Sequence, residues 1–269
     1  MSVLIRDSMY PGTRISRRQS PSLLANMIGG GQHEGSSNTI VETMALIRND
    51  MAEASSIAIT LFEEVGRQAR QRNILCNGVG REGTYRLTGL SDTDGESLDL
   101  LSSSITSLGF EDSVGMAVDV AGNLETSERA SMLVSNWRQR FDRLQMIEDP
   151  VSPLSDSEWS DFVGRFPELA VAADDLTSSR AERAGVAADV GASHVVAKID
   201  QAGSITELLE FVSAARAKGL CVIASHRSQT AGDTNIVDVA FGIGADILKI
   251  GSPSRERVAC YNRAMALSH

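Results

Sequence analysis

The sequence predicts a closed α/β barrel of the (β/α)8 type, in which eight strands are surrounded by helices. After about residue 110, short apolar runs alternate with helical patterns, as repeated βα units would produce; the runs are residues 114–120, 144–147, 169–173, 195–199, 221–224 and 247–250. Such runs suit a parallel sheet that is covered on both faces. Two earlier runs, 23–28 and 40–46, bring the strands to eight, the number that closes a barrel. A doubly wound open sheet is the structural alternative.

Length and composition limit the domain organisation. The 269 residues, 42% of them hydrophobic, are enough for one barrel or for two smaller domains. Residues 1–20 carry arginines among serine, glycine and proline with little apolar periodicity, so we expect an irregular N-terminal arm there. The strand series then favours one barrel domain over residues 21–269.

Helix and loop signals fill in the rest of the chain. Apolar residues recur at helical spacing from Met51 to Ala69 and predict a long amphipathic helix. The glycine-rich residues 77–83 and the polar residues 91–96 are expected to form an extended connection. Ser204, with a glutamate three residues later, forms a capping-box pattern that predicts the start of another helix.

Charge and cysteine content exclude several functional classes. A net charge of −10 without a basic stripe argues against nucleic acid as the main partner. No apolar run reaches the roughly 18 residues of a membrane span, and the first residues do not resemble a secretory signal, so we expect a cytoplasmic protein without membrane contact. Cys76, Cys221 and Cys260 lie far apart in apolar surroundings and are expected to be buried thiols.

Three predicted strands end in a carboxylate. Asp119, Glu148 and Asp174 follow successive apolar runs, about one βα unit apart. Taken singly, an aspartate after a strand is more often a helix cap or turn residue. Because the carboxyl ends of parallel strands meet at one face of a barrel, however, the three carboxylates should converge, and oxygen ligands of this kind suit Mg²⁺.

The next three units place cationic groups at the same face. Lys198 and Lys249 end apolar runs, where an ammonium group is costly unless carboxylates or substrate anions lie close by; His226 and Arg227 follow the run between them. Mg²⁺ and one lysine can neutralise a substrate carboxylate and its enediolate-like intermediate, while the other lysine removes the neighbouring proton.

The motifs that carry these residues resemble the enolase family over residues 23–267. They are IEDP at 147–150, ADDLT at 173–177, AKIDQAG at 197–203, SHRS at 225–228 and LKIGSP at 248–253, preceded by GGGQH at 29–33, VE at 41–42 and GVGREG at 78–83. The resemblance implies an enolase-superfamily barrel with an antiparallel start. It also implies an enolase-like carbon–oxygen lyase that converts a phosphorylated hydroxy acid such as 2-phosphoglycerate to phosphoenolpyruvate.

The resemblance assigns a role to each matching residue. It implies that Asp119, Glu148 and Asp174 bind the essential Mg²⁺, and that Lys198 is the base. Glu82 would be the acid that protonates the departing hydroxyl, assisted by Glu42, and Lys249 would hold the substrate carboxylate. His226 would act in catalysis and, with Arg227 and Ser228, grip the phosphate, while His33 would contact substrate or relay a proton. Without the family, Glu82 and Glu42 would be taken for a loop charge and a strand-edge charge.

Departures from the family pattern keep other functions open. An enolase carries an N-terminal domain that closes over the substrate, and we expect this chain to lack it. Arg81 and Thr84 replace the aspartate and second glycine of the acid-bearing loop. One alternative is therefore an enolase relative in phosphonate biosynthesis, a carboxyphosphonoenolpyruvate synthase, whose larger anion Arg81 would accommodate; another is a non-catalytic scaffold. A homodimer, or a separate capping subunit, is the expected assembly.

Overall fold

The computed structural model describes residues 1–9, 20–30, 39–80, 82–91, 93–227 and 232–268. The strands are β1 (Ser22–Gly29), β2 (Glu42–Ile47), β3 (Leu75–Val79), β4 (Tyr85–Thr88), β5 (Val114–Asp119), β6 (Leu144–Glu148), β7 (Ala170–Ala173), β8 (His194–Ala197), β9 (Cys221–Ser225) and β10 (Ile247–Ile250). The α-helices are α1 (Ser2–Met9), α2 (Met51–Gln71), α3 (Glu96–Leu108), α4 (Ser127–Arg140), α5 (Asp156–Arg165), α6 (Ala184–Asp189), α7 (Ile199–Ala202), α8 (Ile205–Ala217), α9 (Asn235–Ile243) and α10 (Val258–Leu267). Short 3-10 turns, Ala181–Arg183 and Arg255–Arg257, precede α6 and α10.

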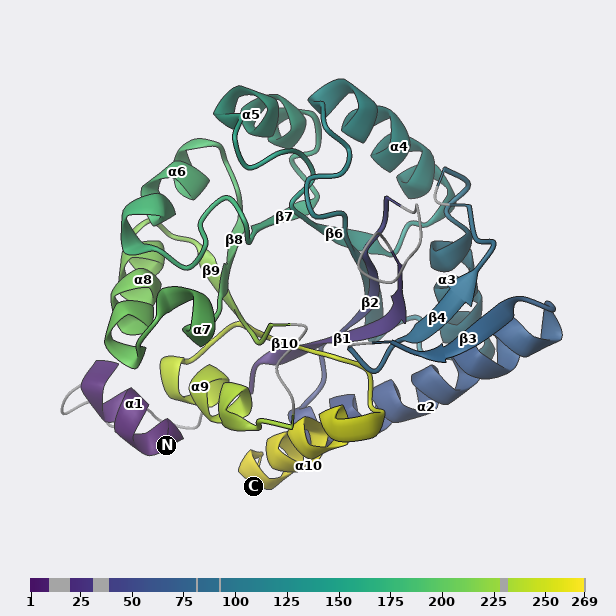
Figure 1. The fold of residues 1–269 in the computed structure, drawn as a ribbon, viewed down its shortest axis with the longest axis horizontal. Coiled ribbons are helices and arrows are strands. Elements are labelled where there is room, and N and C mark those ends of the chain that lie inside the picture. The colour runs from purple at the N-terminus through teal and green to yellow at the C-terminus, as the bar shows by residue number, and fades with distance from the viewer. Residues whose placement is uncertain (10–19, 31–38, 81, 92, 228–231, 269) are drawn as a thin grey trace.

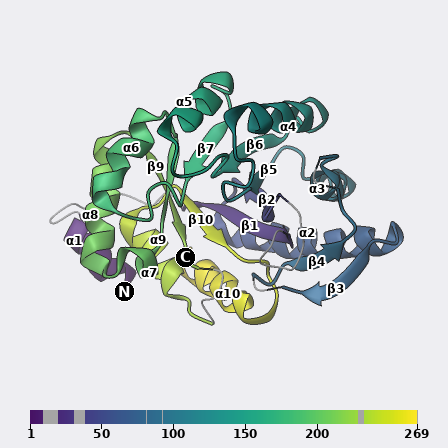
Figure 2. The ribbon, with the colours of Figure 1, turned by 45° about the horizontal axis from the view of Figure 1, so that its top comes forward.

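Eight of the described strands close into a barrel. Their order is β1, β2, β5, β6, β7, β8, β9 and β10, and β10 pairs in parallel with β1 to complete the ring. Strand β2 runs antiparallel to both of its neighbours, whereas the pairs from β5 onward are parallel. Figure 1 looks through the ring and shows the helices outside it, and Figure 2 shows the same arrangement tilted. The predicted barrel with an antiparallel start is confirmed.

Two separate apolar clusters hold this barrel together. The outer one fills the space between strands and helices, and includes fully buried Trp137 and Trp159. The inner one takes residues from every barrel strand and fills the barrel itself: Leu24, Met44, Leu46, Ala117, Met146, Ala172, Val196, Ile223 and Ile247. Alternate residues of each strand serve the two clusters, since successive side chains of a strand point to opposite faces.

The predicted long helix and the helix predicted to start at Ser204 are both present. Helix α2 begins after Asp50, whose side chain accepts hydrogen bonds from the backbone N–H groups of Ala52 (3.0 Å) and Glu53 (3.2 Å). Helix α8 begins after Ser204, whose hydroxyl accepts from the N–H of Glu207 at 3.2 Å. Among the described helices, none is both long enough and apolar enough to cross a membrane.

The expected irregular arm is wrong for residues 2–9. These residues form α1, which packs on α9, and the buried side chain of Ile5 lies where a side chain on Gly242 would be. A Cβ atom at position 242 would come within 2.8 Å of Ile5. A single eight-residue helix, whose described residues include one buried apolar side chain, leaves too little periodicity to stand out in the sequence.

The expected extended connection is a β-hairpin instead. Strands β3 and β4 pair antiparallel. Strand β4 also pairs in parallel with the C-terminal end of β1, outside the closed ring (Figure 1). Strand β3 is almost wholly exposed, so the apolar alternation that marks a half-buried strand is missing from its sequence. Cys76 lies on this strand and is exposed, and Cys221 is half-buried, so buried thiols are confirmed only for Cys260.

Tyr85 fixes the hairpin to helix α2. Its ring stacks on Phe62 with 4.2 Å between ring centroids, and its hydroxyl lies above Gly66, where a Cβ atom would approach it to 2.3 Å. Glycine in a helix interior ordinarily costs about 1 kcal/mol relative to alanine. At Gly66 the absence of a side chain leaves space for Tyr85, which holds the hairpin against α2.

We therefore predict that Gly66→Ala lowers the free energy of unfolding by about 1–2 kcal/mol, because crowding of Tyr85 outweighs the gain in helix propensity. Gly164→Ala in α5 is the matched control, since a Cβ atom there meets nothing within 4 Å. The control should gain up to about 1 kcal/mol. Urea unfolding measures both; equal stabilisation of the two variants would show that Tyr85 moves aside freely.

Candidate active site

A layer of polar side chains lies next to the inner apolar cluster, one from each barrel strand or from the residue that directly follows it. Each polar residue stands two positions from a residue of that cluster, toward the same end of the barrel: Asn26, Glu42, Asp119, Glu148, Asp174, Lys198, Ser225 and Lys249. The pleat repeats every two residues, so all eight side chains point inward. Seven of them, all but Glu148, line a cavity of about 190 Å³.

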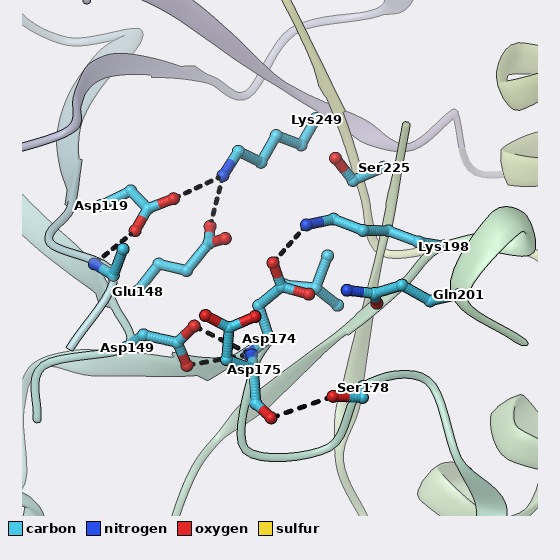
Figure 3. Close-up of polar contacts among 12 residues, drawn as sticks. Asp119, Glu148, Asp149, Asp174, Asp175, Ser178, Lys198, Gln201, Ser225 and Lys249 are labelled. Atoms are coloured by element: carbon cyan, nitrogen blue, oxygen red, sulfur yellow. Dashed lines mark hydrogen bonds and ion pairs between the residues drawn. The ribbon is translucent and has the colours of Figure 1, made fainter. Parts of the chain in front are cut away.

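Lys249 is the centre of the carboxylate cluster (Figure 3). Its Nζ lies 2.7 Å from Oε2 of Glu148, 2.9 Å from Oε2 of Glu42 and 3.2 Å from Oδ2 of Asp119. Burial opposes the charge of this lysine, but the three carboxylates raise its pKa well above the ordinary value. Lys249 is therefore a fixed ammonium group.

Lys198 occupies the neighbouring sector and pairs with Asp174 (Figure 3). Its backbone N–H donates to the hydroxyl of Ser179 at 2.9 Å, which holds the end of β8 in place. Burial lowers the pKa of Lys198, but the charges of Asp174 and Glu148 outweigh burial and raise it above the ordinary value. The strand predicted over residues 195–199 ends earlier than expected. Strand β8 stops at Ala197, and Ile199 already belongs to the short helix α7.

Asp149 holds the backbone that directly follows β7. Its Oδ1 accepts from the backbone N–H of Asp174 at 3.0 Å, and its Oδ2 from that of Asp175 at 2.9 Å (Figure 3). Its own backbone has φ +45°, a left-handed conformation that aspartate tolerates better than most residues. Asp149, Asp174 and Asp175 offer oxygens within 4.8 Å of one another. The neighbouring strands β6 and β7 are thus joined at the point where the predicted ligands emerge.

The donor set fits a divalent cation. Among the described residues, neither Oε1 of Glu148 nor Oδ1 of Asp174 receives a hydrogen bond, although both atoms are buried. Such oxygens are costly unless a cation or donor faces them. Burial and the charge of Asp119 also raise the pKa of Glu148 well above its ordinary value. In the polar layer four carboxyl groups face two lysines, and a divalent cation bound there would favour the ionised form of these carboxyl groups.

A second group of ionisable side chains surrounds Glu82, which lines the cavity from the loop between β3 and β4. Oε2 of Glu82 lies 2.9 Å from Nε2 of His226, and Oε1 lies 3.7 Å from Nη2 of Arg257. Burial raises the pKa of Glu82, but the hydrogen bond and charge of His226, with Arg257, bring it below the ordinary value. Burial raises the pKa of Glu42 to about 7 against the opposing effect of Lys249. The two predicted acids therefore occupy different electrostatic environments.

Comparison with known proteins identifies the family. The chain matches the C-terminal TIM barrel domain of enolase over residues 19–131 and 123–269. It belongs to the enolase family. Similar proteins include the enolases of Sulfolobus acidocaldarius, 29% identical over 265 residues, and of Saccharolobus solfataricus, 28% identical over 269 residues. The matches cover 92% and 93% of this chain but 63% and 64% of those enolases, so the chain spans less than two thirds of their length.

The enolase barrel brings most of the predicted site residues together. Glu42, Glu82, Asp119, Asp174, Lys198, His226, Arg227 and Lys249 line one cavity, and Glu148 joins them through Lys249. Arg227 is exposed. His33, Ser228 and Arg81 lie outside the described residues. The roles given to all of these residues stay predictions.

Sequence reasoning missed several residues that build this enolase site. Asp149 and Asp175 stood inside motifs that were already recognised, beside the residues chosen as ligands. Asn26 donates to Oε1 of Glu42 at 2.8 Å, and its position two residues after Leu24 of the inner cluster was the available signal. Arg257 stands in a polar segment, where its burial could not be foreseen.

We predict that Asp149→Ala lowers the free energy of unfolding by about 2–4 kcal/mol, because two backbone N–H groups lose their acceptor. Asp149→Asn is the matched control: it retains one carbonyl oxygen and should lose about half as much. Urea unfolding of the two variants measures the difference. If Asp149→Ala matches the unmodified protein, the carboxylate does not hold β6 to β7.

Proposed function

We propose that this enolase-family chain is a Mg²⁺-dependent lyase that removes the proton next to the carboxylate of a phosphorylated hydroxy acid. The substrate we favour is 2-phosphoglycerate, with phosphoenolpyruvate and water as products. The observation that carries this proposal is that Lys198, Lys249, Glu82 and His226 line one small cavity. These are the groups that α-proton abstraction and loss of a hydroxyl require.

Asp119, Glu148 and Asp174 are the residues that would hold the Mg²⁺. The unpartnered oxygens of Glu148 and Asp174, and the excess of carboxyl groups over lysines in the polar layer, support this assignment. When bound, Mg²⁺ would offset the carboxylate charges that raise the pKa of Lys198 and would stabilise negative charge on the substrate carboxylate.

Different side chains carry out the two steps of the reaction, removal of the proton and loss of the hydroxyl. Lys198 takes the proton from C2, and electrons move toward the substrate carboxylate, which the Lys249 ammonium group holds. The C3–oxygen bond then breaks, and the hydroxyl leaves as water with the proton that Glu82 shares with His226 across their hydrogen bond, with Glu42 nearby. His226 orients Glu82 through its 2.9 Å hydrogen bond. His226 and Arg227 would hold the phosphate together with Ser228, and His33 would contact the substrate.

The other functions implied by the sequence remain outcomes of the tests below. Carboxyphosphonoenolpyruvate synthesis depends on Arg81, which lies outside the described residues. A scaffold without catalysis would not need ionised lysines buried among carboxylates, which are expensive to maintain. A cytoplasmic location, and a homodimer or a separate capping subunit, likewise stay proposals, and light scattering of the purified protein decides the assembly.

Metal binding gives the first test. Calorimetric titration with Mg²⁺ should show at least tenfold weaker binding for Glu148→Gln and Asp174→Asn, because each loses a charged oxygen ligand. Asp142→Asn is the control, since Asp142 has an 88% exposed side chain outside the cavity and should bind as the unmodified protein does. Equal affinity in all variants would remove these two residues from the metal site.

Proton abstraction gives the second test. With 2-phosphoglycerate and Mg²⁺ in deuterated water, exchange at C2 should fall at least about a hundredfold in Lys198→Ala, since a positioned base contributes on that scale. Lys218→Ala, an exposed lysine at the end of α8, is the control and should retain exchange. Survival of exchange in Lys198→Ala would make another group the base.

Product analysis separates the candidate functions. Formation of phosphoenolpyruvate from 2-phosphoglycerate alone supports the lyase. Turnover only after a nucleotide-linked phosphonoformate is added would instead identify the transferase. Absence of both turnover and exchange would favour the scaffold.

A further inference from the structure

The segment after β10, residues 251–257, lies against the loop that carries Glu82. The backbone N–H of Ser252 donates to the carbonyl oxygen of Glu82 at 2.8 Å. The hydroxyl of Ser254 donates to the carbonyl oxygen of Gly83 at 2.6 Å. Two consecutive peptide groups of the acid-bearing loop are therefore tied to a segment that begins two residues after Lys249.

Close approach of the two backbones depends on Gly251. A Cβ atom there would lie 2.3 Å from the carbonyl oxygen of Glu82 and 2.8 Å from its Oε2. No side chain fits at that distance. The carbonyl of Gly251 accepts from the hydroxyl of buried Tyr261 on α10 at 2.7 Å, so the segment is itself held from behind.

Arg257 reaches the same carboxylate from inside the protein. It is 1% exposed, and its Nη2 lies 3.7 Å from Oε1 of Glu82, while Oε2 faces Nε2 of His226 at 2.9 Å. The two carboxylate oxygens are thus divided between a guanidinium and an imidazole. Rotation of the carboxylate would lengthen one contact or the other, so the two cationic groups together favour this orientation.

The segment also reaches the second acid. The Ser252 hydroxyl donates to the carbonyl oxygen of Asn26 at 2.5 Å, and the Asn26 amide donates to Oε1 of Glu42 at 2.8 Å. One short stretch of chain therefore sets the positions of Glu82 and, through Asn26, of Glu42.

We propose that Arg257 is a positioning residue, which with residues 251–254 holds the Glu82 carboxylate beside His226 in the orientation that delivers a proton to the departing hydroxyl. The proposal rests on the function proposed above, because it concerns the acid step of that reaction. It assigns Arg257 no contact with the substrate. Loss of Arg257 should therefore slow loss of the hydroxyl while leaving proton abstraction by Lys198 intact.

The test compares Arg257→Met and Arg257→Lys with Arg263→Met. Arg263 is the matched control because it forms an ion pair of the same kind, at 2.8 Å from Asp238, outside the cavity. Hydrogen–deuterium exchange of the peptide that contains residues 82–84 reports the position of the loop without any substrate. C2 exchange and phosphoenolpyruvate formation from 2-phosphoglycerate report the two steps of the reaction, each as kcat and KM.

In Arg257→Met we expect faster amide exchange at residues 82–84, at least tenfold lower kcat for phosphoenolpyruvate formation, little change in KM and unchanged C2 exchange. Arg257→Lys should recover most of both losses, and Arg263→Met should change neither measurement at the loop. Should Arg257→Met fail to fold, Ser254→Ala removes the bond to Gly83 alone and should give the same pattern more weakly.

Unchanged amide exchange and unchanged kcat in Arg257→Met and in Ser254→Ala would overturn the inference. Equal loss of C2 exchange and of product formation would also overturn it, since that result indicates general damage to the site. If the unmodified protein neither exchanges C2 nor forms product, the proposed function fails, and amide exchange at residues 82–84 alone then decides whether Arg257 holds the loop.

Discussion

The closed register of the barrel, combined with the two-residue repeat of the pleat, is the constraint on which the site depends. An inward-facing residue is followed two positions later by another inward-facing residue, so the apolar layer inside the barrel fixes where the next layer lies. Leu24 leads to Asn26 and Ile247 to Lys249, and β2 obeys the same rule in reverse, with Glu42 two residues before Met44. The apolar layer both closes the floor of the cavity and aligns the groups above it.

The ionisable groups that lie on this apolar layer are largely removed from water, so their charges must be compensated. Each group loses water, so each charge must be compensated by its neighbours or by a ligand. Lys249 is compensated by three carboxylates, and Lys198 by Asp174. Burial and the charge of Asp119 raise the pKa of Glu148, and one buried oxygen of Glu148 and one of Asp174 receive no hydrogen bond from the described residues. A cation bound to these carboxylates would therefore also compensate their buried charge.

The sequence predicts the part of the molecule that repeats. Asp119, Glu148 and Lys198 could be chosen because each closes an apolar run, and the regular βα period shows that the ends meet. It does not predict helix α1 or the β3–β4 hairpin, since α1 is a single short helix and β3 is exposed and carries no apolar alternation. Nor does it predict Arg257, whose contact with Glu82 joins residues far apart in the chain and depends on burial.

The predictable and the unpredictable parts of the structure supply different groups to the cavity. The parallel units from β5 to β10 supply the carboxylates and lysines, whose positions the barrel period sets. Glu82 comes from a hairpin outside the ring, which that period does not position. Its location is instead set by separate contacts, the stacking of Tyr85 on Phe62 and the bonds from Ser252 and Ser254. Because Ser252 and Ser254 follow just after Lys249 on β10, the regular half of the barrel also helps to position Glu82, while the stacking on Phe62 ties the hairpin to α2.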